Sequence, residues 1–163
     1  MVRNQCRVLA IRATLLMVAL SLFAGRPVRA FDDPVLVGAT FHSHTNNEDK
    51  DHDTGIYLKV MTSDGSGIIA HADNRDNSGD DGTQYKDGSD HEFGLDIDAR
   101  AIRRSACKAF LVHMWIHTHG NDTWRFNGWV RLDFSDGTNL VANLGNSELK
   151  NDGASTDFAA PAS

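Results

Sequence analysis

Carboxylate and amide side chains crowd the segment between residues 48 and 98, and these are the side chains that bind hard cations. Counted along the sequence, Glu48 to Asp98 holds 14 carboxylates against 4 lysines and arginines. In a folded loop so many like charges repel one another, and some must take up protons unless a cation neutralises them. Ca²⁺ accepts six to eight oxygen ligands, which aspartate, asparagine and free backbone carbonyls supply. The segment therefore indicates either a calcium-binding loop system or, on composition alone, a solvated acidic loop.

Three acidic clusters fall between segments that have strand-like patterns. They are Glu48–Asp53, Asp73–Asp81 and Gly120–Trp124. Each alone is weak evidence, because Asp, Asn and Gly are ordinary turn residues, and none has the twelve-residue spacing of an EF-hand. The loops of a β-sandwich gather at its two ends, so acids far apart in the sequence are expected to converge on one ion.

Short strands are the elements that would position these loops. Alternation of apolar and polar side chains, with turn signals at Asp64-Gly65 and Asp136-Gly137, indicates seven or eight of them. They are Val35–Phe41, Gly55–Thr62, Ile68–Ala72, Glu92–Ile97, Phe110–His117, Trp129–Phe134 and a segment around Leu140 and Ala142. Only Asp98–Ala109 spaces its basic residues as a helix does, which predicts a turn or two of helix. The pattern predicts an all-β, antiparallel β-sandwich.

Two terminal segments lie outside the predicted domain. Residues 1–30 combine an arginine-rich start, an apolar run and Val28-Arg29-Ala30, a pattern typical of a secretory signal peptide cleaved after Ala30. The protein is thus expected to be secreted or periplasmic. Residues 31–149 form the predicted sandwich. Residues 150–163, rich in Gly, Ala, Ser and Asp, are predicted to be a flexible C-terminal tail.

Cleavage after Ala30 changes the charge and the cysteine count. It removes five arginines and no acids, so 16 basic residues become 11 against 22 acidic ones, a net charge of −11. Nothing in such a chain offsets phosphate repulsion, which excludes nucleic acid as the expected partner and also excludes a polybasic membrane binder. Cys107 remains as a single cysteine, so no intrachain disulfide is expected, and its predicted role is that of a small buried hydrophobe.

Short motifs follow one another along the chain in a fixed order. An acidic loop is followed by a Gly-Ile-Tyr-Leu strand, an Asp-Gly turn, an Asp-Asn-Ser-Gly-Asp-Asp loop, a Phe-x-Leu strand, a Met-Trp-Ile strand, an Asn-Asp-Thr-Trp loop and a Trp-Val-Arg-Leu strand. This order resembles that of the PLAT domain, above all the calcium-dependent C-terminal domain of clostridial alpha-toxin phospholipase C. The likeness covers about Val35 to Leu144. It implies an eight-stranded sandwich of two four-stranded sheets that contacts a membrane lipid surface or a protein partner through Ca²⁺ and is not an enzyme.

Carried over position by position, the resemblance implies two calcium sites and an aromatic lipid contact. The first site comprises Asp76, Asn77, Gly79 through its carbonyl, and Asp81; the second comprises Asp49, Asp51, Asp122 and Thr123 through its carbonyl. Trp124 takes the place of an exposed aromatic residue beside the second site, and Trp124 and Phe126 are expected to bury apolar area in a membrane interface. Thr54 and Gly55 stand where the toxin-type pattern continues with acids.

Two other functions remain open on the sequence. His113, His117 and His119 share strand parity, as do His42 and His44, and imidazoles on one face are ligands for Zn²⁺ or Cu²⁺ in a periplasmic metal-binding protein. Exposed strand-end histidines explain the same pattern. In a carbohydrate-binding module of jelly-roll type, Trp115, Trp124 and Trp129 would stack on sugars and calcium would be structural.

Catalysis finds little support in the residue pattern. The carboxylate pairs are explained equally well as ion ligands, so they do not indicate a glycosidase. The sequence has no nucleophile-elbow pattern, phosphate-binding loop or His-Glu-x-x-His motif. The sequence determines neither the oligomeric state nor the choice between a lipid, a protein and a glycan as partner.

Overall fold

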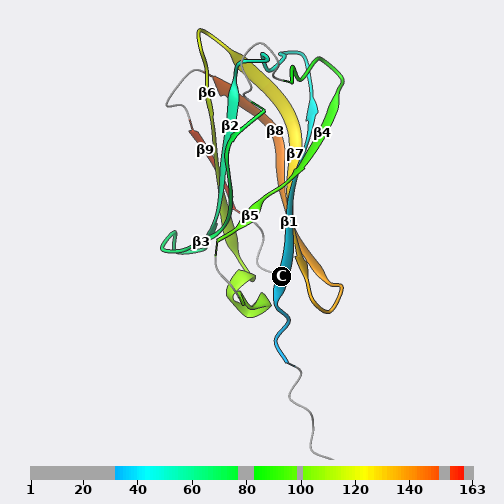
Figure 1. The fold of residues 1–163 in the computed structure, drawn as a ribbon, viewed down its shortest axis with the longest axis vertical. Helices are drawn as coiled ribbons and strands as arrows, with labels where there is room; N and C mark the ends of the chain where they lie inside the picture. The colour runs from blue at the N-terminus through cyan, green and yellow to red at the C-terminus, as the bar shows by residue number, and fades with distance from the viewer. Residues whose placement is uncertain (1–31, 77–82, 99–100, 151–154, 160–163) are drawn as a thin grey trace, which may run out of the picture. The chain divides into compact units, whose positions relative to one another are not determined.

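The computed structural model describes residues 32–76, 83–98, 101–150 and 155–159 (Figure 1). The predicted signal peptide, residues 1–30, lies outside the described residues. In the described ranges no helix is both long enough and apolar enough to cross a membrane. The unit Asp33–Ser163 is built from strands, in the order β1 Leu36–Thr45, β2 Gly55–Thr62, β3 Ile68–Arg75, β4 Asp90–Gly94, β5 Asp96–Ile97, β6 Phe110–His117, β7 Thr123–Phe134, β8 Asn139–Lys150 and β9 Ser155–Ala159.

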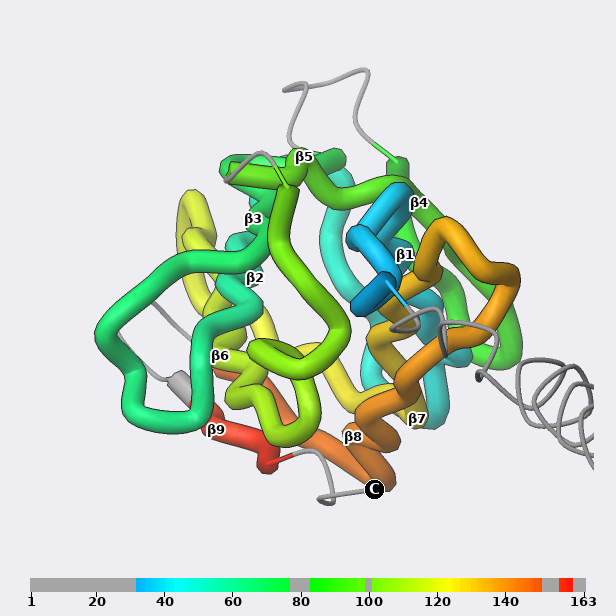
Figure 2. Tube along the Cα trace, turned by 90° about the horizontal axis from the view of Figure 1, so that it is seen from below, coloured from blue at the N-terminus to red at the C-terminus, as the bar shows by residue number. Residues whose placement is uncertain are grey.

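The strands form two antiparallel sheets that face each other as a β-sandwich (Figures 1 and 2). One sheet has four strands in the order β4-β1-β7-β8, and the other has five in the order β5-β3-β2-β6-β9. The predicted all-β sandwich is confirmed in its architecture. The expected eight strands in two sheets of four are wrong for the described residues, which form nine strands in sheets of four and five.

The core lies between the sheets and follows from the alternation in the sequence. In β6, Val112, Met114 and Ile116 are fully buried, while the residues between them are half-buried on the outer face. In β2, Leu58 and Val60 are buried in the same way. Because side chains alternate across a strand, one apolar face from each sheet is removed from water, and this burial drives the two sheets together.

The predicted strands match the structure best where alternation is strict. Gly55–Thr62 and Phe110–His117 are β2 and β6 with the predicted ends. The predicted strand Glu92–Ile97 is wrong as a single element, because the chain leaves one sheet and enters the other at Leu95. The amide of Leu95 donates to the carbonyl of Ala39 at 2.9 Å, whereas two residues later Ile97 pairs with Ala70 in the opposite sheet.

The C-terminal segment also differs from its prediction. Residues 155–159, assigned to a flexible tail, form β9, which pairs with β6 at the edge of the five-stranded sheet. Asp157 lies 2.5 Å from the imidazole of His113, and Phe158 packs against the core. In the predicted helical segment, a single 3₁₀ turn spans Arg104–Cys107, and Cys107 is buried as predicted.

Candidate cation site

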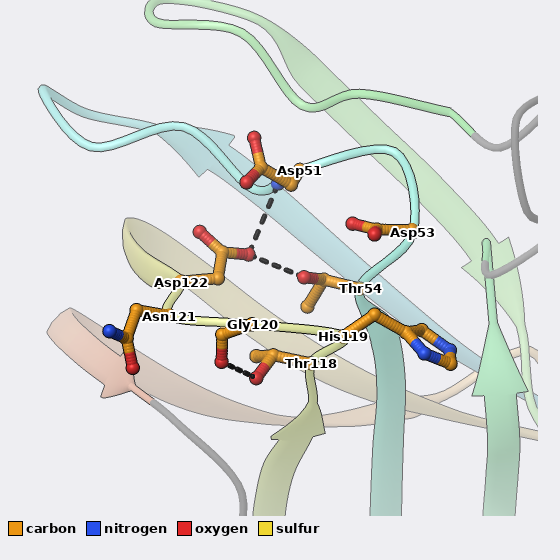
Figure 3. A pocket seen from close by; sticks show the side chains of 8 residues that line it. All are labelled: Asp51, Asp53, Thr54, Thr118, His119, Gly120, Asn121 and Asp122. Carbon is orange, nitrogen blue, oxygen red and sulfur yellow. Dashed lines mark hydrogen bonds between the residues drawn. The ribbon is translucent and has the colours of Figure 1, made fainter.

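A small pocket of about 60 Å³ lies at the end of the sandwich where the β1–β2 and β6–β7 loops meet (Figure 3). The loops are neighbours because β2 pairs with β6, so that Gly55 at the start of β2 lies opposite His117 at the end of β6. The pocket is lined by Asp51, Asp53, Thr54, Thr118, His119, Gly120, Asn121 and Asp122. Two of the predicted calcium ligands, Asp51 and Asp122, are thus brought together.

Asp122 is the most firmly held of these carboxylates. It is 8% exposed, and its Oδ2 accepts hydrogen bonds from the backbone N–H of Asp51 at 3.1 Å and from the hydroxyl of Thr54 at 2.6 Å (Figure 3). The aspartate therefore ties the β6–β7 loop to the turn that precedes β2. Thr54 stands where the toxin-type pattern has an acid, and here it serves as a donor to Asp122.

Asp51 and Asp53 place two further carboxylates beside Asp122. Desolvation by the neighbouring loop, followed by the negative charges of Asp122 and Asp53, raises the pKa of the Asp51 carboxyl above its usual range, although the residue is exposed. This is the repulsion expected when like charges share a small space. A bound cation would relieve it, and the carboxylate and amide oxygens available here are the ligands that Ca²⁺ prefers.

Lys50 lies beside the pocket, and the sequence pattern did not single it out. Its side chain is 0% exposed, and its Nζ donates to the carbonyls of Asp51 at 2.9 Å and Thr54 at 2.8 Å. The ammonium also lies over the ring of Tyr85, 4.8 Å from the centroid. Burial lowers the pKa of Lys50 to about 8, against the opposing attraction of nearby carboxylates, chiefly that of Asp76, so the side chain stays protonated at pH 7. The clue in the sequence was a single lysine among the acidic residues at positions 48–53.

Asp76, from the first predicted calcium site, is near enough to this lysine to act on it electrostatically. The buried hydroxyl of Tyr85 donates to Asp76 Oδ2, and the Tyr85 ring stacks on His91 with 3.5 Å between ring centroids. Burial, followed by the hydrogen bond to Asp76, raises the pKa of Tyr85 above its usual value. Asn77, Gly79 and Asp81, the other members of that predicted site, lie outside the described residues.

The second predicted site is assembled only in part. Asp49 does not line the pocket, because its carboxylate accepts hydrogen bonds from the Asp87 backbone at 2.9 Å and from the Gln84 side chain at 3.2 Å. Thr123 is the first residue of β7, paired with Lys150, and does not line the pocket either. In the ranges that the structure describes, no three His, Cys, Asp or Glu side chains are arranged as a metal centre. A cation here would require Asp51 and Asp53 to turn toward Asp122.

The expected lipid contacts are wrong, because Trp124 and Phe126 belong to the core. Both side chains are 0% exposed, and their rings stack with 4.1 Å between centroids. The indole Nε1 of Trp124 donates to the hydroxyl of Thr45 at 3.1 Å. The physical reason is that β7 begins at Thr123, so that Trp124 and Phe126 alternate inward with the rest of the strand.

The histidines fall into three groups. His113 pairs with Asp157, whereas His42 and His44 both approach Asp90, at 3.6 and 3.0 Å, and the ring of His42 also stacks on Trp129. The rings of His117 and His119 meet edge to face with 5.8 Å between centroids, and in the described ranges no third His, Cys, Asp or Glu joins either pair as a metal centre.

The three tryptophans of the carbohydrate alternative lie in three different parts of the sandwich. Trp115 stacks on Tyr57 on the outer face of the five-stranded sheet, Trp129 lies on the outer face of the four-stranded sheet, and Trp124 is in the core. They cannot form one sugar-binding strip, so that version of the alternative is wrong.

Comparison with known proteins supports the fold. Neither a protein-family model nor a curated protein matches the chain. A solved structure, the alpha toxin from Clostridium absonum, matches with a TM-score of 0.50 and 18% sequence identity over 82% of this chain and 33% of the toxin chain. The chain thus spans about a third of the toxin's length. At this identity the likeness establishes a shared fold alone: a β-sandwich of the PLAT/C2-like kind found in the C-terminal domain of clostridial alpha toxin.

Proposed function

We propose that this chain is a non-catalytic, PLAT/C2-like module whose end pocket binds Ca²⁺ and, through the ion, contacts an anionic surface. The observation that carries the proposal is the meeting of Asp51, Asp53 and Asp122, from two loops far apart in sequence, around one small pocket. The raised pKa of Asp51 supports it, because a divalent cation would relieve the repulsion among these carboxylates.

A calcium ion in this pocket would keep open coordination positions. One oxygen from each of the three carboxylates and one from the amide of Asn121 make four ligands, and since Ca²⁺ takes six to eight, water or an oxygen of a partner would complete the shell. A lipid phosphate or a carboxylate on a protein supplies such an oxygen. Because Trp124 and Phe126 are in the core, no aromatic insertion by these two rings reinforces the contact, and the association is expected to be weak and reversible.

Calcium binding is tested by isothermal titration calorimetry and by thermal unfolding in CaCl₂ and in EDTA. The double variant Asp51→Asn/Asp53→Asn is expected to lose at least about tenfold in calcium affinity, because two charged ligands become neutral. It keeps the Asp51 backbone N–H that Asp122 needs. Glu92→Gln, an exposed carboxylate on β4, is the matched control and should bind calcium like the wild type.

At a calcium concentration 100 times the dissociation constant, binding should add about 2.7 kcal/mol to the free energy of unfolding. A wild-type chain that shows neither heat of binding nor a shift of the unfolding temperature in millimolar CaCl₂ contradicts the proposal.

The partner is tested by co-sedimentation with vesicles of phosphatidylserine and of phosphatidylcholine, each with calcium or with EDTA. Sedimentation with the anionic vesicles that needs calcium and is lost in Asp51→Asn/Asp53→Asn supports a lipid surface. Calcium binding without vesicle binding would instead favour a protein partner.

A further inference from the structure

Lys50 is the one charged group in the described end loops that the calcium proposal leaves unused although it is fully buried. The backbone of Lys50 is held in place, because Lys50 and Tyr85 exchange both main-chain hydrogen bonds, at 3.1 and 3.0 Å. Its side chain then runs back under the turn of residues 51–54. The ammonium is therefore placed by the fold and does not reach its position as a flexible surface side chain.

Two oppositely charged side chains hold the turn between Lys50 and β2: a cation binds its acceptors and an anion binds its donors. The carbonyls of Asp51 and Thr54 accept hydrogen bonds from Lys50 Nζ, whereas the N–H of Asp51 and the hydroxyl of Thr54 donate to the Asp122 carboxylate. The Lys50 ammonium is thus surrounded by two carbonyl oxygens and the face of the Tyr85 ring. These are groups that also bind free cations.

We propose that the Lys50 ammonium is a tethered cation, occupying a cation site built from the carbonyls of Asp51 and Thr54 and the ring of Tyr85. It organises the end of the sandwich, and with it the pocket around Asp122, in the absence of metal. The inference goes beyond calcium binding and holds whether or not the pocket takes up Ca²⁺.

The surrounding charges explain why a cation is needed at this position. Four carboxylates act on Lys50 electrostatically, those of Asp76, Asp122, Asp51 and Asp53. Without the ammonium these acids would repel one another with no positive charge between them, and two backbone carbonyls would lose their donor. Removing one partner from a buried polar cluster is costly because the remaining groups stay buried and unpaired.

The first test is thermal unfolding of the full chain in EDTA. Lys50→Met keeps an unbranched apolar side chain as far as the Cε position but removes the ammonium with its charge and donors, and its unfolding temperature should fall by about 10 °C. Lys59→Met is the matched control, since Lys59 lies over the ring of Trp115 at 5.4 Å on the outer face of the sheet, and it should fall by no more than about 3 °C. Equal small effects in both variants would overturn the inference.

The second test separates charge from packing. In Lys50→Ala, added n-propylammonium should restore at least half of the lost unfolding temperature in EDTA, and n-propanol should not. Equal recovery with both compounds would show that Lys50 acts by packing, and recovery with neither would show that the position does not take up a free cation; either result would overturn the inference. If Lys50→Ala does not fold alone, refolding in n-propylammonium against n-propanol gives the same comparison. Because no calcium is present, a failure of calcium binding leaves this result unaffected.

Discussion

The carboxylate of Asp122 accepts a hydrogen bond from the hydroxyl of Thr54 at 2.6 Å, although 68 positions separate the two residues. The contact exists because β2 and β6 are paired neighbours, which places the start of one beside the end of the other. The same carboxylate oxygen also accepts the N–H of Asp51. Asp122 therefore stabilises the loops themselves, separately from any role as a calcium ligand.

Replacing Asp122 by alanine should destabilise the protein even in EDTA. The change leaves the Asp51 N–H and the Thr54 hydroxyl without their acceptor, which is expected to lower the free energy of unfolding by about 2–3 kcal/mol. Thr54→Val removes one of the two bonds and should cost about 1 kcal/mol. Chemical denaturation measures both, with Asn121→Ala, a pocket residue outside this pair of bonds, as the control. Wild-type stability of Asp122→Ala in EDTA would contradict the described contact.

Trp124 should report a buried environment that membranes do not change. In a Trp115→Phe/Trp129→Phe background it is the single tryptophan left, because the chain has three. Its emission should be blue-shifted, weakly quenched by acrylamide and unaltered by brominated anionic vesicles in calcium, since the ring is 0% exposed. Quenching by the brominated lipid would restore the lipid-contact role that the structure assigns to neither Trp124 nor Phe126.

Gly128 should not tolerate a side chain. A Cβ at this position would lie 2.8 Å from the carbonyl oxygen of His42, closer than real Cβ contacts, and 3.1 Å from the ring of Phe126, which is tight. Gly128→Ala should therefore destabilise the protein by about 2 kcal/mol or more, because strands β1 and β7 must separate locally. Gly94→Ala on β4 meets no atom within 4 Å and serves as the control in the same denaturation experiment.

The hairpin between β2 and β3 should contribute an acid-dependent part of the stability. Asp64 accepts hydrogen bonds from the hydroxyls of Thr62 and Ser66 and from the Ser66 N–H, and these bonds lower its pKa from 3.8 to about 2. A pKa that is lower in the folded than in the unfolded chain stabilises the fold above about pH 4, and this contribution is lost as the pH falls through 2. The carboxyl carbon shift of Asp64 should titrate near pH 2.

The stability of the Asp64→Asn variant should be compared with that of the wild type over the same range of pH. The wild type should exceed this variant in stability at pH 5, and the difference should disappear by about pH 2. A carboxyl that titrates at its ordinary pKa of 3.8 would show that these hydrogen bonds do not hold in solution.

The sequence predicts those parts of the fold that depend on local periodicity. Strands β2 and β6 have their predicted ends because buried and outer residues alternate without interruption. The split of Glu92–Ile97 could not be predicted, since alternation continues across Leu95 while the hydrogen-bond partner changes from one sheet to the other. Trp124 was misplaced because the cluster Gly120–Trp124 was assigned to a loop and compared with an exposed aromatic residue of the family, whereas β7 already begins at Thr123.

The candidate site was predictable only in outline. Loop clustering at the end of a sandwich follows from the fold class, and it brought Asp51 and Asp122 together as expected. Asp49 is held away from the pocket by a hydrogen bond from the Asp87 backbone, which the spacing of residues in the sequence does not predict. Lys50 is hidden for a similar reason: a lysine among acids looks solvated, and its burial depends on acceptors that only the folded turn provides.

Strand β9 determines how the five-stranded sheet ends. By pairing with β6 it covers main-chain groups of a long apolar strand, and it leaves a border of only five residues that includes Asp157. A short edge strand that carries a charge is a poor template for the addition of a strand from another molecule. A chain trimmed before Ser155 would leave residues 111–115 of β6 without their partner strand, and it is expected to self-associate more readily than the full chain.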